Sequence, residues 1–194
     1  MGKGEETRQA ILDEATGLAS QVGLDGLTIG SLAARTHLSK SGLFAHFASK
    51  EALQAQVLEH ASARFVDLVV RPALAAPRGE PRLRALFDRW LAWEADAYPG
   101  GCPFVAAMAE LDDRPGPVRD QLVRSQLDWL DTIAQVFRTG VAEGRFRADA
   151  DPEQFAHDLQ GVMLAYHHAS RLLRDPAAET RARRAFEALL AAAT

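Results

Sequence analysis

The sequence predicts an all-α protein. Runs in which β-branched and polar residues alternate are missing, whereas the helix-favouring residues Ala, Leu, Arg and Glu are abundant. Apolar residues recur at helical spacing, and Ser, Thr, Gly and Pro punctuate the chain between these stretches. The pattern predicts about nine helices joined by short loops.

The composition is that of a soluble globular protein of 194 residues, 47% hydrophobic and 25% charged. The net charge of −4 argues against a protein that coats nucleic acid, but it is compatible with one local contact surface. The single cysteine, Cys102, excludes an internal disulfide and a multi-cysteine metal site. No apolar run approaches the ~18 residues of a membrane span, and the N-terminus lacks the apolar core of a signal peptide. We therefore expect a cytoplasmic protein without a membrane segment.

The first three helices are expected to be short units with clear capping residues. The first runs from the N-cap Thr7 to Gly23, which is expected to end it as a left-handed C-cap. Thr28 caps a second helix over residues 29–35, where Ser31 stands at the position that a complete capping box gives to Glu or Gln. Ser39 caps a third helix that begins at Lys40 and ends at Phe44 or His46.

Two short helices joined by a tight turn and braced by a first helix form a helix-turn-helix pattern. The second short helix of such a unit enters the major groove of DNA with its N-terminal residues against the base edges. Lys40, Ser41 and Gly42 give this helix a small, polar start, and Gly42 permits a close approach of its backbone to DNA. Leu43 and Phe47 are expected to anchor the helix from behind.

The remaining helices are expected to be longer. Ser49 caps a fourth, which Pro72 is expected to stop at Arg71. Further helices are predicted over residues 82–98, 104–111, 118–141, 152–173 and 178–192, with Pro- and Gly-containing turns between them.

Residues 8–53 resemble the DNA-binding domain of the TetR (tetracycline repressor) family of bacterial transcription regulators. The resemblance is carried by the glycine-punctuated end of the first helix, Thr28 with Leu32-Ala33, and the runs 38–47 and 49–53. It implies that Ser39 and the residues around it form the DNA contact surface. The implied contacts are to phosphate at Thr28, to bases at Lys40, Ser41 and Gly42, and to the DNA backbone at Phe44, His46 and Lys50.

Two positions depart from the family pattern. Phe44 stands where the family usually has tyrosine, so one phosphate hydrogen bond, worth about 1 kcal/mol, should be absent. His37 stands in the turn where glycine is common, and we expect it to adopt a positive φ.

The resemblance also implies a C-terminal ligand-binding and dimerisation domain over residues 49–194, after a DNA-binding domain over residues 1–48. Residues 152–173 and 178–192 are the candidates for the dimer interface, where the family forms a four-helix bundle. Several side chains are candidates to line a pocket for a largely hydrophobic small-molecule effector: Trp90, Trp93, Phe104, Met108, Trp129, Tyr166 and His167. Core packing is the alternative for each of the aromatic residues.

These observations predict a homodimeric, ligand-responsive transcriptional repressor that binds a palindromic operator in double-stranded DNA. No cofactor, metal site or catalytic residue is expected, because no nucleophile–base–acid set, phosphate loop or metal triad is found in the sequence. Cys102 as a redox sensor is a further possibility, although a lone buried cysteine is more often a small hydrophobic residue. The main alternative is a helical adaptor that binds protein partners without DNA.

Overall fold

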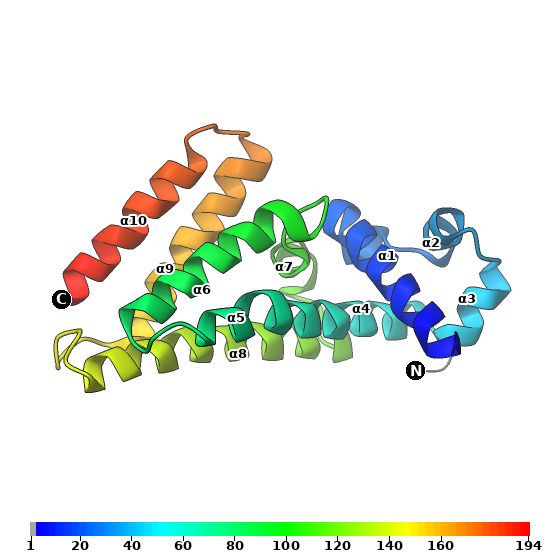
Figure 1. Cartoon of the computed structure of the whole chain (residues 1–194). Coiled ribbons are helices and arrows are strands. Elements are labelled where there is room, and N and C mark those ends of the chain that lie inside the picture. The colour runs from blue at the N-terminus through cyan, green and yellow to red at the C-terminus, as the bar shows by residue number, and fades with distance from the viewer. Residues whose placement is uncertain (1–2) are drawn as a thin grey trace. The chain divides into compact units, whose positions relative to one another are not determined.

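The computed structural model describes residues 3–194, without the side chains of Lys3 and Phe44. Every regular element in this range is helical, and the all-α prediction is confirmed. The first helices are α1 (Lys3–Gly26), α2 (Ile29–Thr36), α3 (Lys40–His46) and α4 (Lys50–Phe65), followed by the π-helical turn η1 (Val66–Val70) and α5 (Arg71–Leu74) (Figure 1).

The second half of the chain is also built of helices, two of which end in π-helical turns. The elements are α6 (Glu80–Ala92), η2 (Trp93–Ala97), α7 (Pro103–Leu111), α8 (Pro117–Ala142), α9 (Pro152–His167), η3 (His168–Leu172) and α10 (Ala178–Ala193). Because α4 continues through η1 into α5, residues 3–194 contain nine continuous helical segments. No helix in this range is long and apolar enough to cross a membrane.

The chain forms two compact units. The first comprises Met1–Phe65 and Ala95–Ser125, and the second comprises Val66–Glu94 and Gln126–Thr194. The first unit contains the helix-turn-helix and also α7, which packs against α1. The domain boundary expected between residues 48 and 49 stays a prediction, because the limits of a compact unit need not coincide with those of a functional domain.

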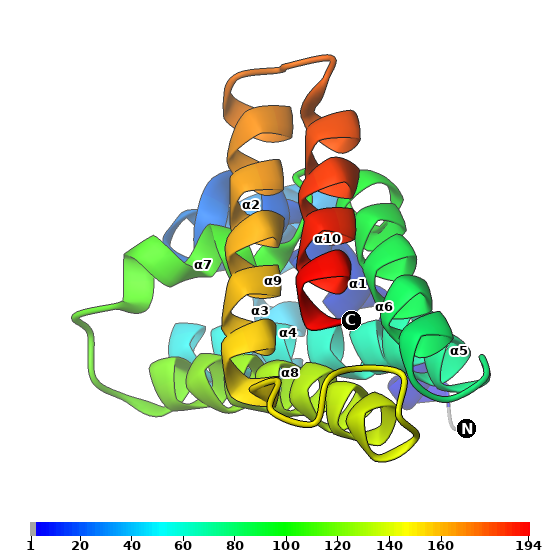
Figure 2. The same cartoon turned by 90° about the vertical axis from the view of Figure 1, so that its left-hand side faces the viewer.

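Each unit has its own apolar core. In the first unit Leu32, Leu43 and Phe47 are fully buried together with residues of α1 and α4. In the second unit the rings of α8 and α9 stack, with the centroids of Phe137 and Phe155 4.4 Å apart. Figure 2 shows α6 and α9 flanking α10, and the ring of Phe186 on α10 stacks on Phe87 of α6 at 4.3 Å.

Three local expectations are corrected by the structure. The first helix begins at Lys3, so Thr7 lies inside it and is not its N-cap. Ser31 completes the capping box, because its hydroxyl accepts a hydrogen bond from the Thr28 amide. The helix does not stop before Pro72 but continues to Leu74. The π-helical turn directly before this proline changes the hydrogen-bond ladder where a regular helix would meet the proline ring.

Candidate nucleic-acid interface and effector region

The helix-turn-helix is held by the capping residues that the sequence predicts. The Thr28 hydroxyl accepts a hydrogen bond from the Ser31 amide at 3.0 Å, and the Ser39 hydroxyl accepts one from the Gly42 amide at 3.1 Å. Between the two helices His37 has φ 57° and ψ 23°, the left-handed conformation expected from its place in the turn. These contacts fix where α2 ends and where α3 begins.

The start of α3 faces solvent while its other side is buried. Ser39, Lys40 and Ser41 are exposed, whereas Leu43 and Phe47 have no exposed surface. The expectation that these two residues anchor the helix from behind is therefore confirmed. The Cε of Lys40 lies 3.9 Å from where a Cβ on Gly30 of α2 would be, so this side chain passes close to α2.

Gly42 has a local reason to be glycine in addition to the close approach to DNA expected from the sequence. A Cβ at this position would lie 3.2 Å from the Ser39 hydroxyl, the group that caps the helix. A larger residue would therefore press on the cap of α3. Whether the Gly42 backbone also meets DNA stays a prediction.

The flanking residues expected to contact the DNA backbone differ in how far they are exposed. Thr28 is exposed at the N-terminus of α2, where free amides favour phosphate. His46 is half-buried at the end of α3. The side chain of Phe44 lies outside the described part of the structure. Lys50 is exposed, but its ammonium donates a hydrogen bond to the Asp25 carbonyl at 2.7 Å, so it is engaged within the protein.

The residues expected to line an effector pocket fall into both compact units. Phe104 and Met108 belong to the first unit, where Phe104 makes an edge contact with Phe65. The other five belong to the second unit: Trp90, Trp93, Trp129, Tyr166 and His167. Trp90 and Tyr166 meet edge to face with their centroids 5.9 Å apart. That these seven residues form one pocket stays a prediction.

A buried carboxylate in the second unit escaped the sequence analysis. Glu94 is only 1% exposed, and its Oε1 lies 2.8 Å from Nδ1 of His167. Glu94 continues the buried stripe of α6 one turn after Trp90, so a charged residue on an apolar stripe was the signal that could have revealed it. The region around Trp90 and Tyr166 is therefore not wholly apolar.

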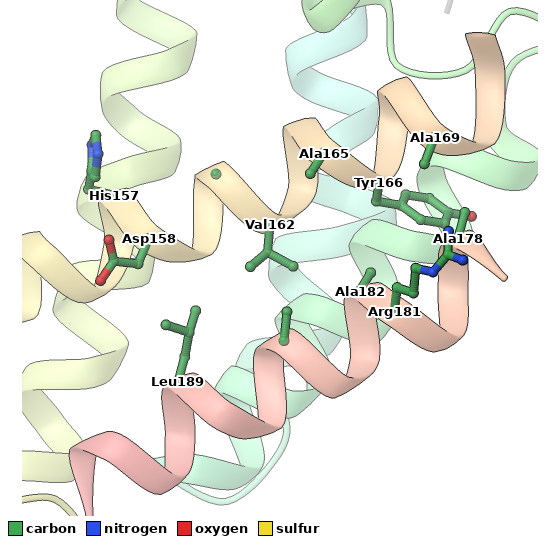
Figure 3. A pocket seen from close by; sticks show the side chains of 12 residues that line it. His157, Asp158, Val162, Ala165, Tyr166, Ala169, Ala178, Arg181, Ala182 and Leu189 are labelled. Atoms are coloured by element: carbon green, nitrogen blue, oxygen red, sulfur yellow. The ribbon is translucent and has the colours of Figure 1, made fainter. Parts of the chain in front are cut away.

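An open apolar groove of about 580 Å³ runs between α9 and α10. Gly161, Val162 and Ala165 line it from α9, and Ala182 and Leu189 are among the residues that line it from α10. In Figure 3 Tyr166 and Arg181 lie at the end near the α9–α10 turn, and His157 and Asp158 lie at the other. Beyond the first end, Leu172 and Leu173 are 71% and 61% exposed. The apolar groove and the exposed leucines together offer a surface that another chain could cover.

A helix-turn-helix at the start of an all-helical chain is typical of a DNA-binding regulator. The model of the tetracyclin repressor-like C-terminal domain matches residues 79–186, and that of bacterial regulatory proteins of the tetR family matches residues 11–57. The chain belongs to the TetR family of transcriptional regulators. No curated protein sequence matches it.

Solved structures show the same fold over nearly the whole chain. A TetR transcriptional regulator from Chloroflexus aurantiacus is 27% identical with a TM-score of 0.83, covering 98% of this chain and 96% of that one. A TetR-family regulator from Cytophaga hutchinsonii is 20% identical with a TM-score of 0.86, covering 100% and 97%. AibR, solved with isovaleryl coenzyme A and operator DNA, is 22% identical with a TM-score of 0.68, covering 83% and 85%.

Proposed function

We propose that this regulator is a homodimeric, ligand-responsive repressor that binds a palindromic operator. The observation that carries the proposal is the start of α3, where three exposed polar residues, Ser39, Lys40 and Ser41, stand on a helix whose other side is fully buried. A rigid helix with a small polar N-terminal face matches the geometry by which helix-turn-helix proteins read base edges in the major groove.

The groove between α9 and α10 supports the homodimer. Its apolar lining needs a partner to exclude water, and a second copy offers the same surface in a two-fold arrangement. A dimer places two reading helices on half-sites separated by about 34–36 Å or a multiple of this distance, which matches a palindromic operator. We therefore propose a second copy of the same protein as the partner of this surface.

Family membership and the aromatic residues of the second unit support a response to a small molecule. We propose that an effector binds near Trp90 and Tyr166 and prefers the form of the protein that does not bind DNA. Binding of the effector would then shift the population toward that form and lower the affinity for the operator. AibR, a protein of this fold, has been solved in complex with isovaleryl coenzyme A and operator DNA. An effector that bound tightly but left the operator affinity unchanged would refute this part of the proposal.

A mobility-shift assay with DNA from upstream of the protein's own gene tests the proposal. We expect a complex that weakens as salt is raised, because phosphate contacts release counterions. Absence of any shift at low salt would favour the alternative, a helical adaptor that binds protein partners. Duplexes selected by the protein from a random library would extend the test to operators located elsewhere.

Lys40→Ala is expected to weaken operator binding about 5- to 150-fold, corresponding to about 1–3 kcal/mol for a direct base contact. The loss should be largest for the native base at one position, so that the variant also discriminates less at that position. Selecting binding sites from a random DNA library with the variant protein measures this loss of discrimination. Arg78→Ala serves as the control, since it removes an exposed cation from the second unit. Equal losses for the two variants would mean that Lys40 contributes only charge.

Lys50→Ala is expected to weaken binding to all sequences alike and to reduce the slope of log K against log salt by about one. A phosphate contact would cause this, and it requires Lys50 to release the Asp25 carbonyl that it binds in the free protein. Measuring the slope for the wild type and for the variant shows whether Lys50 makes such a phosphate contact. An unchanged slope would show that Lys50 serves only the turn at Asp25.

A further inference from the structure

The end of α1 is bent immediately before the helix-turn-helix. Gly23 has φ 75° and ψ 172°, which interrupts the helical ladder, and residues 24–26 form a separate last turn. This turn is closed by a hydrogen bond from the Leu27 amide to the Leu24 carbonyl. Because α2 begins at Ile29, the turn sets the direction in which the chain enters the reading unit.

The amides released by this bend are bound by a side chain that is distant in sequence. One oxygen of the Glu110 carboxylate, on α7, accepts hydrogen bonds from the Leu24 amide at 2.8 Å and from the Asp25 amide at 3.1 Å. Such orphan amides are usually capped by a neighbouring Asp, Ser or Thr. A Cβ at Gly23 would lie 1.7 Å from the other Glu110 oxygen, so glycine is required for the carboxylate to reach its place.

The carbonyl groups of the same turn are bound from α4. Gln54 donates to the Leu24 carbonyl at 2.7 Å, and Lys50 donates to the Asp25 carbonyl at 2.7 Å. Arg114, just after α7, forms an ion pair with the Asp25 carboxylate. The amide side of the turn is therefore fixed by α7 and the carbonyl side by α4, all within the first compact unit.

We infer that Glu110 is a positioning residue for operator binding, which rests on the function proposed above. It lies outside the helix-turn-helix and inside the stretch matched by the C-terminal family model. By holding the turn at Leu24 and Asp25, Glu110 fixes the angle between α1 and the α2–α3 pair, and so the presentation of Lys40 and Ser41 to DNA. A misplaced reading helix loses base contacts even when each contact residue is intact.

The sign of the effect separates positioning from simple electrostatics. DNA is a polyanion, so removing a negative charge from a protein that binds it raises affinity if the charge does nothing else. Glu110→Gln keeps the size of the side chain but replaces two charge-assisted hydrogen bonds by weaker neutral ones. We therefore expect Glu110→Gln to raise the Kd for operator DNA about fivefold, and Glu110→Ala to raise it about 30-fold, because that variant leaves both amides without the acceptor.

The matched control is Asp113→Asn, which removes an exposed carboxylate three residues further along the chain. It is expected to leave the Kd unchanged or to lower it. Hydrogen exchange of the Leu24 and Asp25 amides, followed by NMR on the DNA-free protein, supplies a second measurement. Exchange at these two amides should accelerate strongly in Glu110→Ala and less in Glu110→Gln, while amides in the cores of α2 and α4 keep their protection.

The experiment uses full-length protein and a duplex selected in vitro by the wild type. A weaker Glu110→Gln complex with local amide exposure supports the inference. If the wild type binds this duplex and Glu110→Gln binds as tightly or more tightly, as the control does, the inference is overturned while the proposed function stands. If the wild type selects no duplex, the proposed function fails, and the role of Glu110 in operator binding fails with it.

Discussion

Ala165→Glu is expected to abolish high-affinity operator binding without unfolding the protomer. Ala165 is exposed on α9 and lines the groove between α9 and α10, so the isolated protomer accommodates glutamate in water. Glutamate is also a good helix former. In a dimer that covers the groove, the same carboxylate would lose its hydration among the largely apolar side chains that line the groove, which costs several kcal/mol.

The loss of binding follows from the loss of pairing. Two linked reading heads bind two half-sites with an avidity about 10²–10⁴ times that of one head, without any new contact. A monomeric variant should therefore lose a factor in this range, although α3 and its caps are untouched. Light scattering gives the oligomeric state and a mobility shift gives the affinity, and both should change together.

Thr180→Glu provides the matched control. Thr180 is exposed near the start of α10, and at 100° per residue it points away from the side that carries Ala182 and Leu189. The control adds the same charge to the same helical hairpin, so it should remain dimeric and bind the operator normally. A dimeric Ala165→Glu protein with normal binding would show that the groove is not the dimer interface.

The elements that the sequence predicted correctly are those whose cause is local. The hydroxyl caps Thr28 and Ser39 act on amides three residues away, and the left-handed His37 is imposed by the short turn in which it stands. Burial was predicted equally well, since Leu43 on the inner side of α3 and Phe47, which follows as its C-cap, are both fully buried. Such contacts are visible in a window of a few residues.

The features that were missed depend on residues far apart in the chain. Gly23 adopts a positive φ as expected, but its ψ of 172° is extended rather than left-handed helical, because the following turn is capped by Glu110. The pairing of Glu94 with His167 joins residues 73 apart. Capping rules and apolar periodicity carry no information about such distant partners, so the sequence could mark Glu94 as a charge on an apolar stripe but could not assign a partner to either carboxylate.

The loop before α7 makes a close backbone contact with α1. The Gly100 amide donates to the Ser20 hydroxyl at 3.0 Å, and this bond is buried. The neighbouring Tyr98 is buried beside α1 as well, and this burial raises the pKa of its phenol to about 12, so it stays neutral at physiological pH. The contact leaves no room for a side chain at residue 100.

Gly100→Ala is therefore expected to destabilise the first unit by about 3 kcal/mol, through overpacking and the strained or broken buried hydrogen bond. Its Cβ would lie 1.9 Å from the carbonyl oxygen of Ser20 and 2.5 Å from the Gln21 nitrogen. These are backbone atoms of a helix, which cannot rotate aside as the end of a side chain can. Chemical denaturation followed by circular dichroism measures the change in the free energy of unfolding.

Gly17→Ala is the control that isolates the clash. It also replaces glycine by alanine at the contact between α1 and this loop, but its Cβ would meet only the Pro99 ring, at an ordinary 3.9 Å. Both substitutions reduce the entropy of the unfolded chain to the same degree, so that contribution cancels in the comparison. Because Gly17 lies inside α1, its replacement should stabilise the protein by up to about 1 kcal/mol. Opposite signs for the two variants would show that the loop before α7 packs directly on the α1 backbone, whereas equal effects would contradict the close approach.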